Sequence, residues 1–537
     1  MCRIRRYTFG VHIVLGSIGW LDWSVVGLYF LTVAAVGTWF ARRQKSTEQY
    51  FVGGGRVPGW AAGLSLFASS ISTATFLAYP GNGFGGDWTR QFPNFMLPVA
   101  LILVSVAVIP FYRQVVRMSV YEYLEQRFGY PARAYAAGVY LLVNLFRMGL
   151  VLFLTGKALN AMTGWNTEAI ILICGGITIA YTMFGGFEAV IWTDVMQCLI
   201  LLTGGLLCAG VILASCDDGP WQALRVAYDA NKFKLADVSL DLTQPTILVM
   251  ALYGFFAPAG GYTTTQDTVQ RYLAPSTTRA ARRGLWLGCF SCMTTWMLFM
   301  FIGTMLWVYY RTHPGELPAD IARDQDKVFP RFVMAHLPGG FVGLFVAAML
   351  AAGMSTLSTQ MNSLSMVSIC DFWGRYRPTH ADRHRLLLSK IATCLWGVGG
   401  TVSAISMIGV TKALDFSYVM YSLLAGGLFG IFMLAFLVRR AHAWGVYVGL
   451  LAGALVSLWG TVDELVKLGV PVPAFIRATP FPFHTLTVAA FSSFAAFTAG
   501  LLASLILPAG PGGSHGLTFW DRPSAQPHRQ ELLTAQR

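Results

Sequence analysis

Charged residues are scarce in this chain of 537 residues. Asp, Glu, Lys and Arg together make up 12% of it, whereas hydrophobic residues make up 55% and the mean hydropathy is +0.56. About a quarter of the residues of an average soluble domain are charged, so this composition excludes a soluble globular protein. It predicts an all-α protein that crosses a lipid bilayer many times.

The sequence also lacks the spacings that cysteine chemistry requires. Eight of its nine cysteines lie in or beside apolar segments or at the extreme N-terminus, and only Cys216 lies in a polar loop. No disulfide framework or transition-metal motif is present. There is likewise no nucleophile elbow and no nucleotide-binding loop, so we expect no enzymatic activity.

Long apolar runs dominate the remainder. About 20 apolar residues span the ~30 Å of hydrocarbon in a bilayer, and about thirteen segments meet this requirement. These predicted spans are residues 25–41, 60–80, 92–111, 134–156, 166–184, 188–213, 243–263, 284–309, 334–369, 388–410, 416–438, 443–461 and 484–507.

The net charge of +13 is carried by alternate short loops rather than by one patch. The basic residues follow the first, third, seventh, ninth and eleventh spans: Arg42, Arg43, Lys45 and Arg56; Arg113, Arg117, Arg127 and Arg133; Arg271, Arg279, Arg282 and Arg283; Arg375, Arg377, Arg383 and Arg385; and Arg439 and Arg440. By the positive-inside rule these loops are cytoplasmic. The pattern predicts a plasma (inner) membrane protein with its N-terminus outside and its C-terminus inside, and it argues against nucleic-acid binding.

Two apolar segments are unusually rich in hydroxyl groups. Residues 64–85 read LSLFASSISTATFLAYPGNGFG, and residues 351–369 read AAGMSTLSTQMNSLSMVSI. Polar groups at bilayer depth cost several kcal/mol each unless they are buried in protein or line a cavity. Because hard alkali cations bind neutral oxygens, the two segments indicate an ion-coupled transporter.

Helix-breaking residues recur at corresponding places in two five-span halves. The span at 60–80 is predicted to break between Ala68 and Thr75, and the span at 243–263 is predicted to be interrupted around Gly254, Pro258 and Gly260–Gly261. Paired breaks of this kind are typical of inverted repeats with a substrate site at the bilayer midplane. The alternative is that Gly and Pro are simply common in membrane helices.

We therefore divide the chain into consecutive parts. Residues 1–24 have no assigned role, and residues 25–41 form a leading helix. Residues 60–213 form the first repeat, with core helices 1–5, and residues 243–438 form the second, with core helices 6–10. Two trailing helices at 443–507 and a disordered cytoplasmic tail at 508–537 complete the chain.

Five longer motifs resemble the sodium:solute symporter family, to which sodium/glucose cotransporters belong. They are YFVGG at 50–54, SLFASSIS at 65–72, SVYEYLE with RFG at 119–129, GGFEAVIWTD at 185–194 and QDTVQRYL at 266–273. Several motifs in register along most of a chain are strong evidence of kinship. The resemblance implies the leucine-transporter fold, with two inverted five-helix repeats, and sodium-driven alternating access.

The resemblance also implies a main sodium site between core helices 1 and 8. Its ligands would be the backbone carbonyls of Ala68, Ile71 and Ala352 and the hydroxyls of Ser355 and Thr356. An unwound helix frees such carbonyls, which is consistent with this assignment. Alternatively, these hydroxyls only bond to carbonyls of their own helix or hold neighbouring helices together.

Some family members have a second sodium site, which here would comprise Asp194, Ser355, Ser358 and Thr359. A carboxylate inside a membrane is costly and indicates a function with a definite partner. The alternative for Asp194 is a salt bridge or a protonated carboxyl group. Two sodium ions would favour uptake of an anion, because one ion carrying a monoanion is electroneutral.

Arg147 lies about halfway along core helix 3, in the run RMGLVLFL, which is similar to bacterial sialic acid symporters of the family. Guanidinium binds carboxylate through two parallel hydrogen bonds, so Arg147 is the candidate clamp for an acidic solute. The same resemblance points to the hydroxyls of Ser70, Ser72 and Thr75, with Asn94 as a polar neighbour. An ion pair or snorkelling to the interface is the alternative for Arg147.

The sequence thus predicts a symporter that imports sodium with a small organic solute, with a carboxylate such as sialic acid favoured. A sugar, a monocarboxylate and a vitamin-like acid stay open as substrates. A sensor that uses the same fold is a functional alternative. The expected partners are Na⁺, the solute and the lipid bilayer, with no obligate protein partner.

Overall fold

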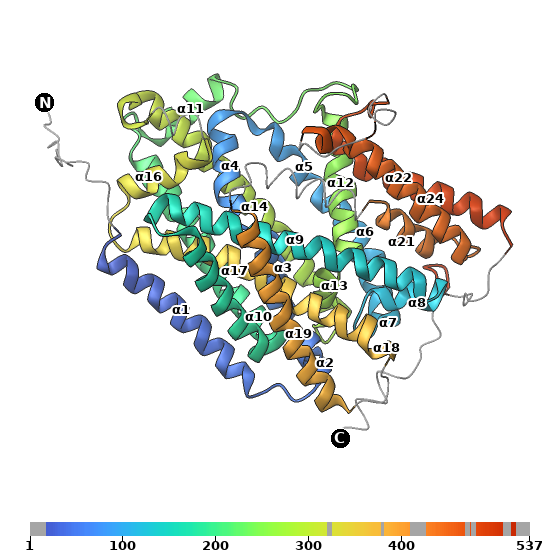
Figure 1. The fold of residues 1–537 in the computed structure, drawn as a ribbon. Helices are drawn as coiled ribbons and strands as arrows, with labels where there is room; N and C mark the ends of the chain where they lie inside the picture. Colours follow the sequence, from blue (N-terminus) through green and yellow to red (C-terminus); the bar gives the residue numbers. More distant parts are fainter. Residues whose placement is uncertain are drawn as a thin grey trace, which may run out of the picture.

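The computed structural model describes residues 18–318, 325–376, 381–408, 426–467, 473, 479–508 and 517–521, and this part of the chain contains helices and no β-strand. The α-helices, shown in Figure 1, are α1 (Trp20–Ala41), α2 (Thr47–Val52), α3 (Gly59–Ser70), α4 (Thr73–Gly85), α5 (Phe92–Phe95), α6 (Leu97–Leu103), α7 (Ile109–Val115), α8 (Tyr121–Phe128), α9 (Tyr130–Thr163), α10 (Thr167–Ala214), α11 (Gly219–Asp229), α12 (Ile247–Thr264), α13 (Gln266–Leu273), α14 (Thr278–Thr312), α16 (Val328–His336), α17 (Phe341–Val367), α18 (Gly374–Tyr376), α19 (Asp382–Ser406), α21 (Leu428–Leu437), α22 (Ala443–Lys467) and α24 (Val488–Ile506).

Within the described residues, ten helices are long and apolar enough to cross a membrane, or eleven if the bent pair α3 and α4 is one span. This is fewer than the thirteen predicted spans. Part of the difference lies in α10, whose 48 residues would extend about 72 Å, more than twice the hydrocarbon thickness. Gly186 interrupts it with φ 59° and ψ −157°, between the predicted spans 166–184 and 188–213. The first ten residues of the predicted span 416–438 lie outside the described part.

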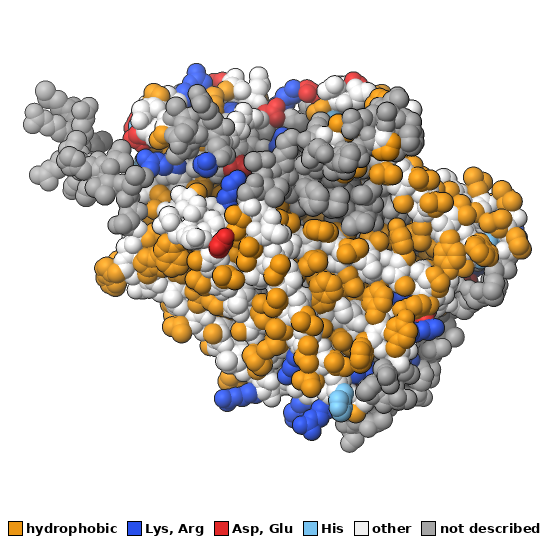
Figure 2. Space-filling view, in the orientation of Figure 1, with side chains coloured by type: hydrophobic (Ala, Val, Ile, Leu, Met, Phe, Trp, Pro, Cys, Tyr) orange, Lys and Arg blue, Asp and Glu red, His pale blue; other side chains and the backbone are white. Residues whose placement is uncertain are grey.

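The surface agrees with a membrane setting. Figure 2 shows hydrophobic side chains over a broad middle zone of one face, with Lys and Arg side chains gathered at its two ends. Exposed apolar residues of this kind occur on α1, α10 and α22, such as Leu31, Leu206 and Leu451. Lipid is the natural neighbour of such a surface.

The centre of the bundle is α17. In its most apolar stretch of 18 residues, 89% of the residues are buried. The helix packs against α1, α9, α10 and α19. Alongside it, α3 lies against α14 with glycine on both sides. A Cβ added to Gly63 would lie 2.2 Å from the Gly284 carbonyl oxygen, and one added to Gly59 would lie 2.3 Å from that of Ala280. Small residues permit this backbone contact, which fixes α3 in position.

The predicted break in core helix 1 is present. Helix α3 ends at Ser70 and α4 begins at Thr73, and the two helices are bent by 61°. The Thr75 N–H donates to the Ser72 carbonyl at 2.9 Å, whereas in a continuous helix it would donate to Ile71. The break therefore frees backbone oxygen at the centre of the bundle.

The predicted interruption of core helix 6 is at a different place. Helix α12 runs through Gly254, Pro258 and Gly260–Gly261 and ends at Thr264, and the break falls at Thr265, with φ −96° and ψ 134°. Beyond it, most residues of α13 are buried in the protein, among them Arg271, which is 1% exposed. The assignment of Arg271 to a cytoplasmic loop is therefore wrong, because the broken helix continues past the end of the apolar run.

The leading helix begins at Trp20, five residues before the predicted start, and Asp22 joins it to the core. The Asp22 carboxylate accepts hydrogen bonds of 2.7 Å from both the Gly340 and the Gly343 N–H groups at the start of α17. Free N–H groups and the positive end of the helix dipole both favour a carboxylate there.

We expect Asp22→Ala to lower the free energy of unfolding by about 2 kcal/mol, because it removes charge-assisted hydrogen bonds. Thermal unfolding of the purified protein in detergent would show this as a lower midpoint. Asp22→Asn keeps one acceptor oxygen and should lie between Asp22→Ala and the parent. An unchanged midpoint in Asp22→Ala would contradict the anchoring role.

Residues 517–521 fall within the stretch predicted to be a disordered tail, yet they pack against the end of α21. The Phe519 ring stacks on Phe436 with centroids 4.5 Å apart, and the Phe519 N–H donates to the Phe436 carbonyl at 3.0 Å. The Trp520 indole donates to Leu437 at 2.8 Å. Aromatic burial and open helix-end carbonyls explain this order, which polar composition alone did not predict.

Candidate functional site

The first cluster of candidate residues lies where the break after α3 meets α17. The Ser355 hydroxyl is 3.1 Å from the carbonyl oxygens of both Ala68 and Ala352, and the Thr356 hydroxyl is 3.3 Å from the Ala352 carbonyl. All four residues are at most 3% exposed. The structure therefore brings together four of the five residues assigned to the main sodium site.

The fifth, Ile71, is the first residue after α3 and is fully buried. It is also the residue whose carbonyl the break releases from helical bonding. The Thr356 hydroxyl bonds to a carbonyl of its own helix, and the Ser355 hydroxyl contacts both its own helix and α3, which are the two arrangements that the alternative interpretation allowed. A hydroxyl that donates its hydrogen keeps two lone pairs, however, so these bonds leave oxygen lone pairs for a cation.

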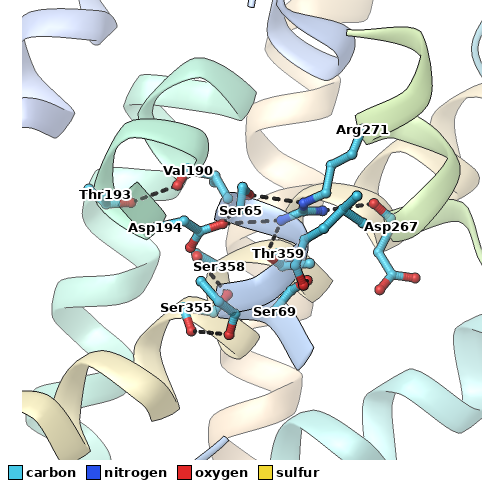
Figure 3. A network of polar contacts seen from close by, with 12 residues as sticks. Ser65, Ser69, Val190, Thr193, Asp194, Asp267, Arg271, Ser355, Ser358 and Thr359 are labelled. Carbon is cyan, nitrogen blue, oxygen red and sulfur yellow. Dashed lines mark hydrogen bonds and ion pairs between the residues drawn. The ribbon is translucent and has the colours of Figure 1, made fainter. Parts of the chain in front are cut away.

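The second cluster surrounds Asp194 on α10 (Figure 3). Its Oδ2 accepts hydrogen bonds from the Ser65 hydroxyl and from Arg271 Nη2, the latter at 3.1 Å. The same Nη2 donates to the Thr359 hydroxyl at 2.7 Å. Asp194 and Thr359 are thus joined through a buried arginine. This is the ion pair that the sequence left open as an alternative.

The ion pair leaves one carboxylate oxygen unused. Asp194 Oδ1 is buried and has no hydrogen-bond partner among the described residues. Ser358, which Figure 3 shows near Asp194, donates to the Ser355 carbonyl at 3.1 Å. Ser355 and Ser358 thereby connect the two clusters along one face of α17. An unsatisfied carboxylate oxygen in a dry interior is costly, so it favours a bound cation or a proton.

Asp267 adds a second buried carboxylate to the network. Its Oδ1 lies 3.0 Å from the Tyr140 hydroxyl, and its Oδ2 is 3.4 Å from Gln360 Nε2. Its backbone carbonyl accepts from Arg271 Nη1 at 2.7 Å. With both carboxylates ionised, Asp194, Asp267 and Arg271 together carry one net negative charge.

The hydroxyls assigned to the substrate lie at the same break, where they form hydrogen bonds at the ends of α3 and α4. Ser70 donates to the Leu66 carbonyl at 2.8 Å. The Ser72 N–H donates to the Thr75 hydroxyl at 3.4 Å, which caps the start of α4. Asn94 donates to the Tyr79 hydroxyl on α4 at 3.0 Å, so it contacts the same helix one turn beyond Thr75.

Arg147 is half-buried on α9, and neither a hydrogen bond nor an ion pair joins it to any residue of the described ranges. The structure does not bring it into contact with Ser70, Ser72 or Thr75. The side of α9 from which the Arg147 side chain leaves can be inferred from Tyr140. Tyr140 lies seven residues earlier and contacts Asp267 in the bundle. Seven residues are almost two helical turns, so both side chains leave α9 on nearly the same side.

Ser65, Asp267 and Arg271 belong to the second cluster but are not among the site residues that the sequence predicts. Ser65 was hidden among the other hydroxyls of its segment, and Arg271 was counted as a loop residue. A signal was present, because QDTVQRYL places Asp267 and Arg271 four residues apart, on one face of a helix. The break at Thr265, which turns this face inward, was not apparent from composition.

A broken helix that meets a hydroxyl-rich central helix, with an unsatisfied carboxylate beside them, defines an ion-coupled membrane transporter. The sequence pattern of the sodium:solute symporter family matches residues 50–453. The chain belongs to this family. The predicted family and sodium as the coupled ion are therefore confirmed.

Two curated relatives are bacterial. The sodium/sialic acid symporter NanT of Aliivibrio fischeri is 32% identical over 446 residues, which cover 82% of this chain and 88% of the relative. The sodium/sialic acid symporter SiaT of Proteus mirabilis is 32% identical over 448 residues, covering 83% and 90%. The human sodium/iodide cotransporter is 29% identical over 512 residues, covering 92% and 76%.

Solved structures agree with the fold. The chain is similar to a Na⁺-coupled sialic acid symporter in a substrate-bound, outward-open state, with a TM-score of 0.82, 28% identity and coverage of 92% of this chain and 100% of the other. Mhp1, a nucleobase-cation-symport-1 family transporter, gives a TM-score of 0.55 at 15% identity, covering 86% and 96%. These likenesses support the predicted leucine-transporter-type architecture of the helices.

Proposed function

We propose that the protein imports a sialic acid together with sodium ions by alternating access across the plasma (inner) membrane, with its N-terminus outside. Two inverted five-helix repeats, flanked by a leading and two trailing helices, would form the thirteen spans. The observation that carries the proposal is the Ser355 hydroxyl, which joins α17 to the Ala68 carbonyl at the break. The names of the bacterial relatives and of the similar solved structure support sialic acid as the solute.

In this proposal one sodium ion binds between α3 and α17. The carbonyls of Ala68, Ile71 and Ala352 and the hydroxyls of Ser355 and Thr356 supply five neutral oxygens, which is a suitable set for a hard cation. Binding joins the break to the central helix. Loss of the ion removes that attraction, so sodium binding and helix movement are coupled.

A second sodium ion binds at Asp194, with the hydroxyls of Ser355, Ser358 and Thr359 as further ligands. The buried, unpartnered Oδ1 of Asp194 supports this assignment. Arg271 holds the other oxygen and so orients the carboxylate. A sodium ion here would neutralise the net negative charge of Asp194, Asp267 and Arg271, which lowers the cost of burying the network.

Arg147 binds the carboxylate of the solute. The hydroxyl-bearing part of the solute contacts four further residues, Ser70, Ser72, Thr75 and Asn94. Arg147 is half-buried on a membrane helix and has no partner among the described residues, which is costly, and a solute carboxylate would satisfy it through two hydrogen bonds. The hydroxyls at the break can accept or donate further hydrogen bonds to a polyhydroxylated acid.

We expect Arg147→Ala to abolish uptake of radiolabelled sialic acid into proteoliposomes, and Arg147→Lys to recover only part of it, because lysine cannot form the two-pronged contact. Lys157→Ala, on the exposed side of the same helix, is the matched control and should transport normally. Sodium should still raise the thermal stability of Arg147→Ala. Normal uptake by that variant would overturn the clamp.

Competition in the same assay tests the choice of solute. Excess unlabelled sialic acid should block uptake, whereas glucose, lactate and biotin should not. Inhibition by one of these three and not by sialic acid would assign the symporter to a sugar, a monocarboxylate or a vitamin-like acid instead.

A further inference from the structure

An apolar crevice of about 240 Å³ lies between α1, α9, α10 and α17, apart from the polar clusters. Its lining includes Val26 and Phe30 of α1, Cys174 of α10 and Leu350 of α17. The hydroxyl of Thr163, which also lines it, is satisfied by the Leu159 carbonyl at 2.8 Å. A cavity with so few free polar groups does not hold ordered water.

The crevice opens towards lipid rather than towards the solute path. Ile173, on its lining, is 44% exposed, and the neighbouring Leu172 is 55% exposed. Both residues belong to α10, which is long and apolar enough to cross a membrane. In a multi-pass transporter, exposed apolar side chains on such a helix face lipid. The crevice is therefore continuous with the exposed apolar surface of α10, which a bilayer would cover.

Two tryptophans mark the mouth of the crevice. The rings of Trp23 and Trp165 stack with centroids 4.6 Å apart and planes 14° apart. The loop that carries Trp165 is fixed by Asn160, which donates to its carbonyl at 2.5 Å. Neither indole N–H donates to another residue in the described part of the chain. Tryptophan, with its large apolar ring and single N–H donor, is enriched at the boundary between headgroups and acyl chains.

We propose that this crevice binds one acyl chain of a membrane phospholipid, from the leaflet in which α1 begins. Its ester or phosphate oxygens accept hydrogen bonds from the Trp23 and Trp165 indoles. Van der Waals contact between the acyl chain and the lining side chains stabilises the complex. The hydrophobic effect contributes little, because the chain moves from one apolar environment to another. A second protein helix has a diameter of about 10 Å, so even one of its turns is too large for a crevice of about 240 Å³.

The bound chain contacts the leading helix and the central helix together. Val346 and Leu350 of α17 line the crevice and lie within about three turns of Ser355 on the same helix. The lipid would therefore support the packing of α1 against α17, next to the Asp22 anchor. This inference does not depend on which solute the protein carries.

Photolabelling tests the proposal in the intact protein. We would reconstitute the chain in phosphatidylethanolamine and phosphatidylglycerol vesicles that contain a phosphatidylethanolamine with a diazirine in its acyl chain, irradiate, and map labelled peptides by mass spectrometry. Strong labelling of residues 26–30 and 170–174, above that around the lipid-exposed Leu206, is expected. Labelling no stronger than at Leu206 would overturn the site.

Gly27→Leu supplies the decisive variant. Gly27 lines the crevice, and a Cβ added there meets no atom within 4 Å, so the backbone accepts a side chain and a leucine there would occupy space in the crevice. Labelling of both segments should fall about tenfold. Gly210→Leu should leave the labelling unchanged, because Gly210 is an exposed position of α10 where an added Cβ likewise meets no atom within 4 Å. Undiminished labelling in a folded Gly27→Leu protein would contradict the proposal.

Discussion

The double variant Ser355→Ala/Thr356→Ala is expected to lose sodium-driven uptake and sodium-induced thermal stabilisation together. Both hydroxyls lie at the junction of α3 and α17, within 3.3 Å of carbonyl oxygens there. Each ligand to a charged partner contributes about 1.5–3 kcal/mol, so loss of one lowers the apparent sodium affinity about ten- to a hundredfold. Loss of two lowers the apparent sodium affinity at least a hundredfold, if the two contributions add.

The unfolding midpoint in sodium chloride and in potassium chloride separates an ion site from a structural hydrogen bond. The parent should be more stable in sodium, whereas the double variant should have one midpoint in both salts. Ser365→Ala is the control, because this buried serine of the same helix bonds to the Ser389 carbonyl instead. If the double variant unfolds earlier but keeps the full sodium effect, the hydroxyls are structural.

Asp194→Asn is expected to change the charge that moves with each solute. Asparagine keeps an oxygen for Ser65 and Arg271 but removes the negative charge that would hold the second sodium ion. With two sodium ions, uptake of a monoanion carries one net positive charge inward. With one ion it is electroneutral, so uptake by the variant should no longer respond to membrane potential.

The energetic consequence is large. Each sodium ion moving through ~100 mV and a tenfold gradient supplies about 2.3 plus 1.4 kcal/mol, and entry of the monoanion costs about 2.3 kcal/mol. Two ions leave about 5 kcal/mol, enough for more than a thousandfold accumulation, and one ion leaves about 1.4 kcal/mol, enough for roughly tenfold.

Valinomycin-clamped potassium potentials across proteoliposomes measure this directly. Asp371→Asn is the matched control, since Asp371 is also a fully buried carboxylate paired with arginine, at 2.6 Å from Arg133. It should keep the response to potential. A voltage response in Asp194→Asn equal to that of the parent would exclude the second sodium ion at Asp194.

The features that the sequence predicted correctly are those that leave a local signature. Apolar runs identified the long helices, and helix-breaking residues indicated a break between Ala68 and Thr75. The meeting of this break with Ser355 was implied by the family resemblance. These patterns depend on the cost of burying polar groups, which acts on every residue separately. The motifs then identified the family.

The features that it missed depend on packing between distant segments. The break at Thr265 lies outside the Gly and Pro cluster, because Pro258 is tolerated within α12. Arg271 is charged and follows an apolar run, so the sequence favours a loop position for it. Only the burial of α13 in the bundle reveals that Arg271 pairs with Asp194. Order at Phe519 likewise depends on a partner, Phe436, more than eighty residues earlier.

Uptake of radiolabelled sialic acid by the purified protein in proteoliposomes, under inward sodium, potassium or proton gradients, tests the central claim most directly. Accumulation above the external concentration with the sodium gradient alone is the result that we predict, with loss of accumulation in Ser355→Ala/Thr356→Ala. Equal uptake under all three gradients would contradict sodium coupling. Sodium-dependent stabilisation without sialic acid uptake under any gradient would contradict the proposed solute.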